Sequence, residues 1–301
     1  MATLFSEIGQ FKTGCLGRQG RLLLCMLDKQ LLASRTEHSI LYLWDNGQLK
    51  DPVTLNWTVA ALCYPDWPET EFVAIGKTGR LLDIRRNGAT RELDPNTQQG
   101  LIIRAVLRNC RVIGGYVYAV GAGHQMIRIA SDFSVHDFSV PSEQRASIGE
   151  TVGFEAVDGF TPEEIYAVGW EGEIWKYNGR YWNIIDSPTN LIHTGIKCAP
   201  DGTVYIVGQQ GGLLHGRGES WQPVESGTRD DLWDVCWFKD RPYVCSITHL
   251  FAMQNGTLAK VPLPPHNPTS FFRLDAIEKA LLSVGADDIC LLVPDRVLKV
   301  L

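Results

Sequence analysis

The sequence predicts an all-β protein built from short antiparallel strands. Glycine supplies 29 of the 301 residues and tryptophan nine, and this combination of frequent turns with large aromatic side chains is typical of short-stranded sheets. Asn-Gly pairs separate apolar runs, and both residues of such a pair tolerate the positive φ of a tight hairpin. Four pairs occupy this kind of position: Asn46-Gly47, Asn87-Gly88, Asn178-Gly179 and Asn255-Gly256.

A recurring phrase, an apolar run that ends in Gly or Ser, predicts the architecture. Its copies follow one another at intervals of 38 to 48 residues, about 42 on average, which is the length of one four-stranded propeller blade. The sequence therefore predicts a seven-bladed β-propeller of four-stranded antiparallel blades, with residues 1–301 forming a single domain. The seven copies end at Ser34, Gly76, Gly121, Gly169, Gly208, Ser246 and Gly285.

The best-defined unit shows how the strands are assigned. We expect strands at 153–157, 165–168, 174–177 and 181–185, joined by turns at Asp158-Gly159, Glu171-Gly172 and Asn178-Gly179. Another turn, Asp201-Gly202, has the phase expected between the first and second strands of the next unit.

Two segments leave alternatives open. Residues 272–282 have the pattern of an amphipathic helix, but the phase of the repeat favours a strand, a tight turn and a second strand. Residues 1–16 precede the seven repeated phrases. They either add a strand that closes the ring or form a lead-in.

The repeats resemble those of the broad WD40/YVTN-like β-propeller superfamily over residues 17–301. Residues 41–45 end in Trp44-Asp45, which is similar to the Trp-Asp ending of the third strand in WD40 repeats. The Gly-His pair that WD40 repeats carry before their first strand is missing, so no subfamily is assigned. The resemblance implies the same closed ring of blades.

Charge and hydropathy argue against nucleic acid and membranes as partners. The chain has 28 Lys and Arg against 34 Asp and Glu, a formal charge of -6, and no basic run is longer than Arg85-Arg86. No stretch of 18 apolar residues or signal peptide is found, which predicts a cytoplasmic protein. The eight cysteines form no Cys-x-x-Cys pair, and most lie in apolar runs, so we expect buried free thiols.

The motifs that carry chemistry are incomplete. Gly76-Lys77-Thr78 ends like a phosphate-binding loop, but Glu71 stands where the first glycine of that motif belongs, and the segment joins two strands. The sequence contains no nucleophile elbow and no His-Glu-x-x-His zinc motif. We therefore predict a non-enzyme, with no catalytic residue, no metal ligand and no cofactor.

The loops between blades and those between the second and third strands of a blade should meet on one face of the ring. Function is often located on loops held by a rigid scaffold, and Trp and Arg on a polar rim are typical of binding hot spots. We expect these loops to bind a partner through Trp57, Gln98, Glu143, Arg145, Trp170, Glu171, His193, Arg229, Asp230, Asp231, Trp233 and His266.

Two functions from different classes follow. The first is a non-catalytic protein, monomeric on its own, that binds a protein partner either as a bacterial immunity protein neutralising a toxin or as a scaffold; the acidic charge suits a basic partner. The alternative is an enzyme or small-ligand binder with a site at the propeller axis. That site would use polar residues near the starts of first strands, such as Arg104, Glu150, His193, Trp233 and Arg273.

Overall fold

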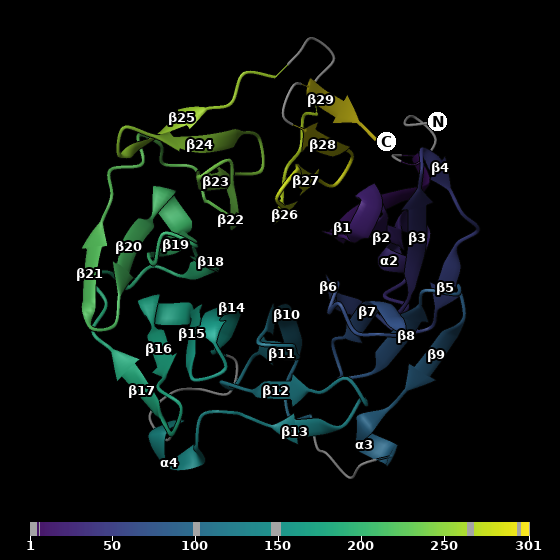
Figure 1. Cartoon of the computed structure of the whole chain (residues 1–301), viewed down its shortest axis with the longest axis horizontal. Coiled ribbons are helices and arrows are strands. Elements are labelled where there is room, and N and C mark those ends of the chain that lie inside the picture. Colours follow the sequence, from purple (N-terminus) through teal and green to yellow (C-terminus); the bar gives the residue numbers. More distant parts are fainter. Residues whose placement is uncertain are drawn as a thin grey trace.

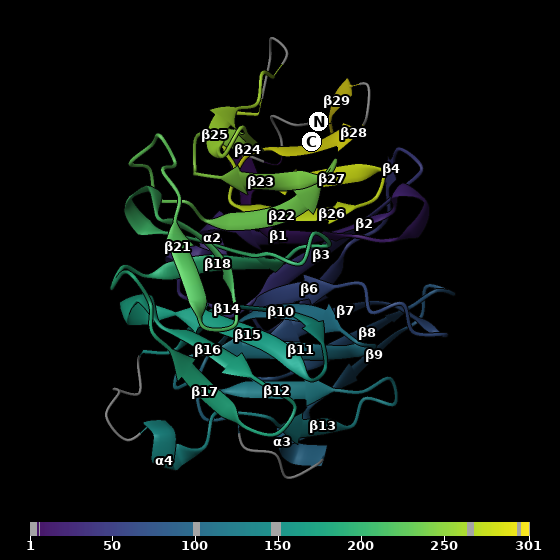
Figure 2. The same cartoon turned by 60° about the vertical axis from the view of Figure 1, so that its left-hand side comes forward.

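Seven antiparallel sheets surround a central axis in the computed structural model (Figure 1). The structure describes residues 5, 7–98, 103–145, 152–263, 268–293 and 296–300. The first strand of each blade lies nearest the axis, whereas fourth strands such as β13 and β21 lie at the periphery (Figures 1 and 2). The prediction of an all-β, seven-bladed propeller is confirmed.

The first three blades follow chain order from the inner to the outer strand. The first contains β1 (Gly9–Leu16), β2 (Leu22–Asp28), β3 (Ser39–Asp45) and β4 (Gln48–Leu49), with β5 (Val53–Leu55) also paired to β3. The second contains β6 (Val59–Cys63), β7 (Thr70–Gly76), β8 (Leu81–Arg85) and β9 (Thr90–Leu93). The third contains β10 (Leu107–Ile113), β11 (Tyr116–Gly121), β12 (Met126–Ile129) and β13 (Val135–Asp137).

The remaining four blades repeat this order. The fourth contains β14 (Phe154–Thr161), β15 (Glu164–Gly169), β16 (Ile174–Tyr177) and β17 (Trp182–Ile185). The fifth contains β18 (His193–Cys198), β19 (Val204–Gly208), β20 (Leu213–Arg217) and β21 (Ser220–Pro223). The sixth contains β22 (Asp234–Phe238), β23 (Arg241–Cys245), β24 (Leu250–Gln254) and β25 (Thr257–Lys260), and the seventh contains β26 (Arg273–Ile277), β27 (Ala280–Val284), β28 (Ile289–Val293) and β29 (Arg296–Lys299).

Besides the helical residues Phe5, Glu7 and Ile8 before β1, the described residues form short helical segments in the connections. They are α2 (Lys29–Ala33), α3 (Pro95–Gln98) and α4 (Ser142–Arg145), with 3-10 turns η1 (Arg18–Gly20), η2 (Trp170–Gly172) and η3 (Gln209–Gly211). The side chain of Asp28 caps α2 by accepting from the backbone N–H groups of Gln30 and Leu31.

The Asn-Gly pairs form hairpins between third and fourth strands, as predicted. Asn255 and Gly256 adopt φ values of 50° and 82°, the left-handed pair required by a two-residue turn between β24 and β25. The 272–282 segment forms the end of a connection, then β26, a turn and β27, because its apolar residues pair across a hairpin. The strand interpretation of this segment is confirmed.

The turn predicted at Asp158-Gly159 is wrong. Strand β14 continues through both residues to Thr161, and the chain reverses at Pro162 and Glu163. Asp158 is almost fully buried, and its Oδ2 accepts hydrogen bonds from the backbone N–H of Cys198 (2.9 Å) and the ammonium of Lys197 (3.0 Å). Contacts with the next blade therefore keep this polar residue inside a strand.

The core consists of apolar layers between neighbouring blades rather than one central cluster. Val73 and Ile75 of β7, for example, share a layer with Val117 and Ala119 of β11 in the following blade. Because both faces of a blade are covered in this way, its middle strands are mainly apolar. All eight cysteines are buried and free, which confirms that prediction.

Three aspartates join the inner strands of consecutive blades. Asp158 binds the backbone of β18, and Oδ2 of Asp234 accepts the N–H of Leu274 on β26 at 3.0 Å. Oδ2 of Asp275 accepts the N–H of Leu16 on β1 at 2.8 Å. This last bond crosses the seam between the seventh and the first blade, where β26 and β1 are neighbours.

We expect removal of the seam bond to destabilise the ring. Asp275→Ala leaves the N–H groups of Leu16 and Ala276 without the acceptors that they have at 2.8 and 3.0 Å, a loss of about 1–3 kcal/mol of unfolding free energy. Urea unfolding of the variant and of the exposed control Asp51→Ala measures the effect. Equal stability of the two variants would contradict the role given to Asp275.

Candidate partner-binding face

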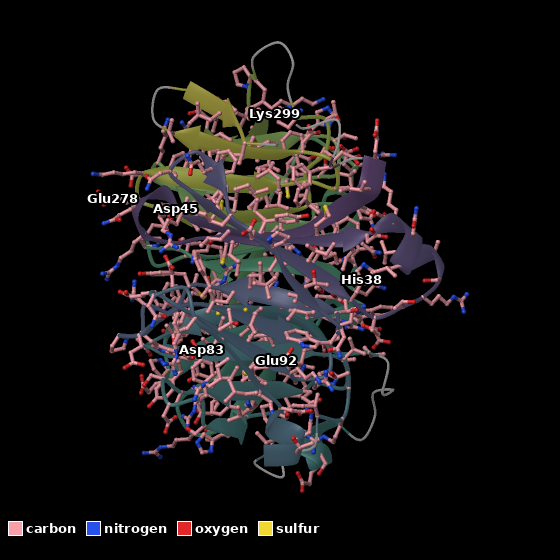
Figure 3. All side chains as sticks on the ribbon, turned by 90° about the vertical axis from the view of Figure 1, so that its right-hand side faces the viewer. His38, Asp45, Asp83, Glu92, Glu278 and Lys299 are labelled. Carbon is pink, nitrogen blue, oxygen red and sulfur yellow. The ribbon has the colours of Figure 1, made fainter. Side chains whose placement is uncertain are left out.

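One face of the ring collects the loops that the sequence predicts as functional. We call it the loop face: it comprises the connections between blades and the turns between second and third strands. Viewed edge-on, His38 marks this face, whereas Asp45 and Glu278 lie at the opposite face (Figure 3). Most of the exposed large apolar side chains of the described residues belong to the loop face or to the strand ends beside it: six of nine, namely Ile8, Leu31, Leu32, Val106, Trp170 and Ile247.

The predicted site residues occupy different depths in this face. Two are buried: Trp57 packs between the first two blades and donates its indole N–H to Glu92, and His193 begins β18. Asp230 and Trp233 are half-buried. The side chains of Gln98 and Arg145 and the whole of His266 lie outside the described structure. The exposed members are Glu143, Trp170, Glu171, Arg229 and Asp231.

Trp170 is the exposed aromatic residue best held in place. Its side chain is 36% exposed, and its indole N–H donates to Oε1 of Glu155 at 2.7 Å. Arg108 pairs with the same oxygen at 2.9 Å and places its guanidinium 5.8 Å from the centre of the indole ring. A preorganised aromatic side chain that is partly in solvent loses little conformational entropy on binding.

The Asp230-Asp231 pair helps to order its loop. Oδ1 of Asp231 accepts the backbone N–H of Gln210 at 2.8 Å, and the carbonyl of Asp230 accepts that of Gly211 at 2.8 Å. Oδ2 of Asp230 lies 3.4 Å from Nδ1 of His249. The loops of the fifth and sixth blades are therefore tied together, with Asp231 still exposed.

A buried polar group fixes the loops of the third and fourth blades. Nε2 of His124 lies 2.6 Å from Oε2 of Glu173, which also accepts the indole N–H of Trp175 at 2.8 Å. All three side chains are buried, so this loop-face region is rigid and polar inside.

The axial channel is polar and contains a cavity of about 250 Å³. Burial lowers the pKa of Arg111 in the channel, but the carboxylates of Asp158, Asp234 and Asp275 outweigh this effect and raise the pKa above its usual value. Burial raises the pKa of Asp275, and its hydrogen bond from Leu16 opposes that shift. Each of these carboxylates already accepts backbone hydrogen bonds that join blades, so they serve the fold.

The predicted axial residues are only partly brought together. Arg273 lines the cavity, whereas Arg104 is exposed and pairs with Asp137 at 3.2 Å. Trp233 packs on Phe272 with ring centres 5.0 Å apart, and Glu150 lies outside the described residues. Within the described structure, no three His, Cys, Asp or Glu side chains are grouped as metal ligands.

Several residues of the channel were not predicted from the sequence. Lys12, Arg108, Arg111, Lys197 and Asp275 lie on inner strands, and four of them line the cavity while Lys12 stands at its loop-face end. Polar side chains within the first strand of each unit were the available signal, because the first strands lie nearest the axis. Assigning β1 to the first blade would have been needed to find Lys12.

Comparison with curated proteins identifies the family. The chain is 32% identical over 294 residues to immune protein Tsi7 of Pseudomonas aeruginosa, covering 96% of this chain and 95% of that protein. The chain belongs to the Tsi7 family of immune proteins. The prediction of a propeller-fold immunity protein is confirmed, and a protein partner is what membership of this family implies. No protein-family model matches the chain.

Solved structures support the fold of this Tsi7-family chain. YCF48 bound to D1 peptide matches with a TM-score of 0.67 and 13% identity, over 94% of this chain and 91% of that one. PorZ, a surface component of the type-IX secretion system of Porphyromonas gingivalis, matches with a TM-score of 0.67 and 10% identity, over 97% of this chain and 38% of that one. In the described residues, no helix has the length and apolarity needed to cross a bilayer.

His193 should make stability depend on pH. Burial lowers its pKa to about 4, against a hydrogen bond to Gly172 that raises it, so the folded state keeps the ring neutral. The unfolded chain takes up a proton below about pH 6.5, so acidification favours unfolding, by about 2 kcal/mol at pH 5.

Urea unfolding at pH 7.5 and pH 5 measures this dependence. His193→Gln should lose about 2 kcal/mol less than the wild type over that interval, because its side chain does not titrate. The exposed control His136→Gln should behave like the wild type. An identical pH dependence for His193→Gln and the wild type would refute the assignment.

Proposed function

We propose that this chain neutralises a protein toxin by binding it with the loop face, without catalysing a reaction. The observation that carries the proposal is the 32% identity to an immune protein across nearly the whole of both chains. The loop face supports it physically, because it combines rigid turns with most of the exposed apolar side chains. The exposed predicted residues Glu143, Trp170, Glu171, Arg229 and Asp231 form part of the proposed surface.

We further propose that the toxin is basic overall. Exposed carboxylates outnumber exposed cations in the described loops of this face, and opposite charge on the partner would accelerate association. The exposed carboxylates are Glu37, Glu143, Glu171, Asp186, Glu225, Asp231 and Asp287, against the cations Lys29, Arg35, Arg104 and Arg229.

We place the protein in the cytoplasm and as a monomer before it meets its partner. Eight buried thiols without a disulfide suit a reducing compartment. Light scattering of the purified chain tests the monomer, and cell fractionation tests the compartment.

Two experiments test the neutralisation. Affinity purification from the native host should recover one stoichiometric protein, and production of that protein without this chain should arrest growth while co-production restores it. Growth arrest that persists under co-production, or a recovered protein that is harmless alone, would overturn the proposal. Reading the genes beside this one provides a rapid first check for a toxin.

Trp170 should be a hot spot for the partner. Trp170→Ala removes an aromatic side chain that Glu155 and Arg108 hold in place, and we expect at least a tenfold loss of affinity, which is about 1.4 kcal/mol or more. The control is Tyr181→Ala, a 55% exposed aromatic side chain at the other end of its blade. Calorimetric titration of the partner into both variants measures the difference; equal affinities would exclude Trp170 from the interface.

A further inference from the structure

Cations gather at the loop-face mouth of the axial channel, in an otherwise acidic protein. The ammonium of Lys12 lies 5.1 Å from the centre of the Phe272 ring, and the guanidinium of Arg273 lies 4.9 Å from the same centre. Lys12 belongs to β1 and Arg273 begins β26, so the two cations stand on either side of the seam between the last and the first blade.

These cations have no acidic partner within the described residues. No ion pair there includes Lys12, Lys77 or Arg273, and Nη1 of Arg273 is shielded from solvent without a hydrogen bond. Burial lowers the pKa of Lys12, and the charges of Arg273 and Lys77 lower it further. A buried donor without an acceptor is costly, and mutual repulsion adds to the cost, so the mouth is suited to receive an anion.

The nearby carboxylates are engaged elsewhere. Glu155 raises the pKa of Lys12, but it pairs with Arg108 at 2.9 Å and accepts the indole N–H of Trp170. The oxygens of Asp234 accept backbone N–H groups from its own strand and from β26. The positive charge of Lys12, Lys77 and Arg273 at the mouth is therefore not neutralised by either group.

An apolar groove lies beside the cations. Phe271, Phe272, Ile247 and Lys12 are among the residues that line this second cavity, of about 170 Å³. Ile247 is 53% exposed and adjoins this groove, so it leaves apolar area beside the cations for a partner to cover. A carboxylate at Lys12 and Arg273 would bring its neighbouring side chain over this groove.

We propose that the channel mouth receives a carboxylate of the protein partner, held by Lys12 and Arg273, with an adjacent apolar side chain in the groove of Phe271 and Ile247. This inference rests on the proposed function. A partner that is basic overall can still present one carboxylate, and the acidic rim around a cationic centre would select the orientation in which it does so. We call this carboxylate, bound by Lys12 and Arg273, the anchor. It would fix the position of the partner relative to the ring axis.

Charge-removing variants of the mouth test the anchor. Lys12→Met keeps the length of the side chain and Arg273→Gln keeps its polarity, and we expect each to weaken binding of the toxin identified by co-purification at least tenfold. The matched control is Lys279→Met, an exposed lysine in the turn between β26 and β27 at the opposite face, which should bind like the wild type. Thermal unfolding confirms that each variant is folded before binding is measured.

A mutational scan of the partner identifies which of its carboxylates binds at the channel mouth. Each Asp and Glu of the toxin is replaced by Asn or Gln, and a separate toxin variant has its C-terminus extended by a glycine-serine tail. One change should cost as much affinity as Lys12→Met and add nothing to it in a double-mutant cycle. Additive losses at every position would overturn the anchor.

Failure of this inference is distinguishable from failure of the proposed function. Wild-type affinity in Lys12→Met and Arg273→Gln, with toxin binding intact, overturns the anchor alone. Absence of any toxin that binds the wild-type chain overturns both. Malonate serves as a free-carboxylate probe in calorimetry: saturable binding that Lys12→Met abolishes while toxin affinity stays unchanged would identify a small-anion site and overturn the anchor.

Discussion

The structure depends on the need of each blade to have both of its faces covered. A four-stranded sheet such as β10–β13 is apolar on two sides, and only the neighbouring blades can remove those sides from water. A row of blades would leave two faces exposed at its ends, so the hydrophobic effect favours a closed ring. The seam between β26 and β1 is the place where this closure must be completed by segments far apart in the sequence.

Polar bonds determine how the blades meet. Apolar contacts alone do not fix the position of one blade relative to the next. A carboxylate that accepts a hydrogen bond from a particular backbone N–H does fix it, because the bond requires one register. Asp158, Asp234 and Asp275 each make such a bond to the next blade, and Asp275 makes it across the seam. The same three carboxylates hold Arg111 charged within the channel. The charged groups inside the channel therefore have a structural role, because they hold neighbouring blades together.

Ring closure also creates the surface on which the proposed function relies. Lys12 and Arg273 reach the same phenylalanine because the first and last blades are neighbours. Trp170 is held by Glu155 and Arg108, which come from two different inner strands. The loop face therefore inherits the rigidity of the ring, and a partner that docks on it meets a preorganised set of aromatic, cationic and acidic groups.

Local pattern by itself determined the blades of this protein. The period of about 42 residues and the Asn-Gly turns specify seven hairpin-rich units, because turn chemistry and strand alternation act over a few residues. The same local reasoning placed a turn at Asp158-Gly159, where a bond to the next blade keeps the strand extended. It located the loop face but could not tell that Trp57 and His193 are buried in it.

Only the tertiary structure decided which side chains share the channel. Lys12 and Arg273 are 261 positions apart in the sequence, and neither segment contains a pattern that predicts their proximity. The two residues become neighbours because seven blades, each rotated relative to the one before it, close into a ring. That rotation is set by the packing between sheets, so it cannot be predicted from a short segment of sequence. The same holds for Asp158, Asp234 and Asp275, which accept backbone N–H groups of the next blade. In the sequence these aspartates look like ordinary polar residues, because their bonding partners are far away along the chain.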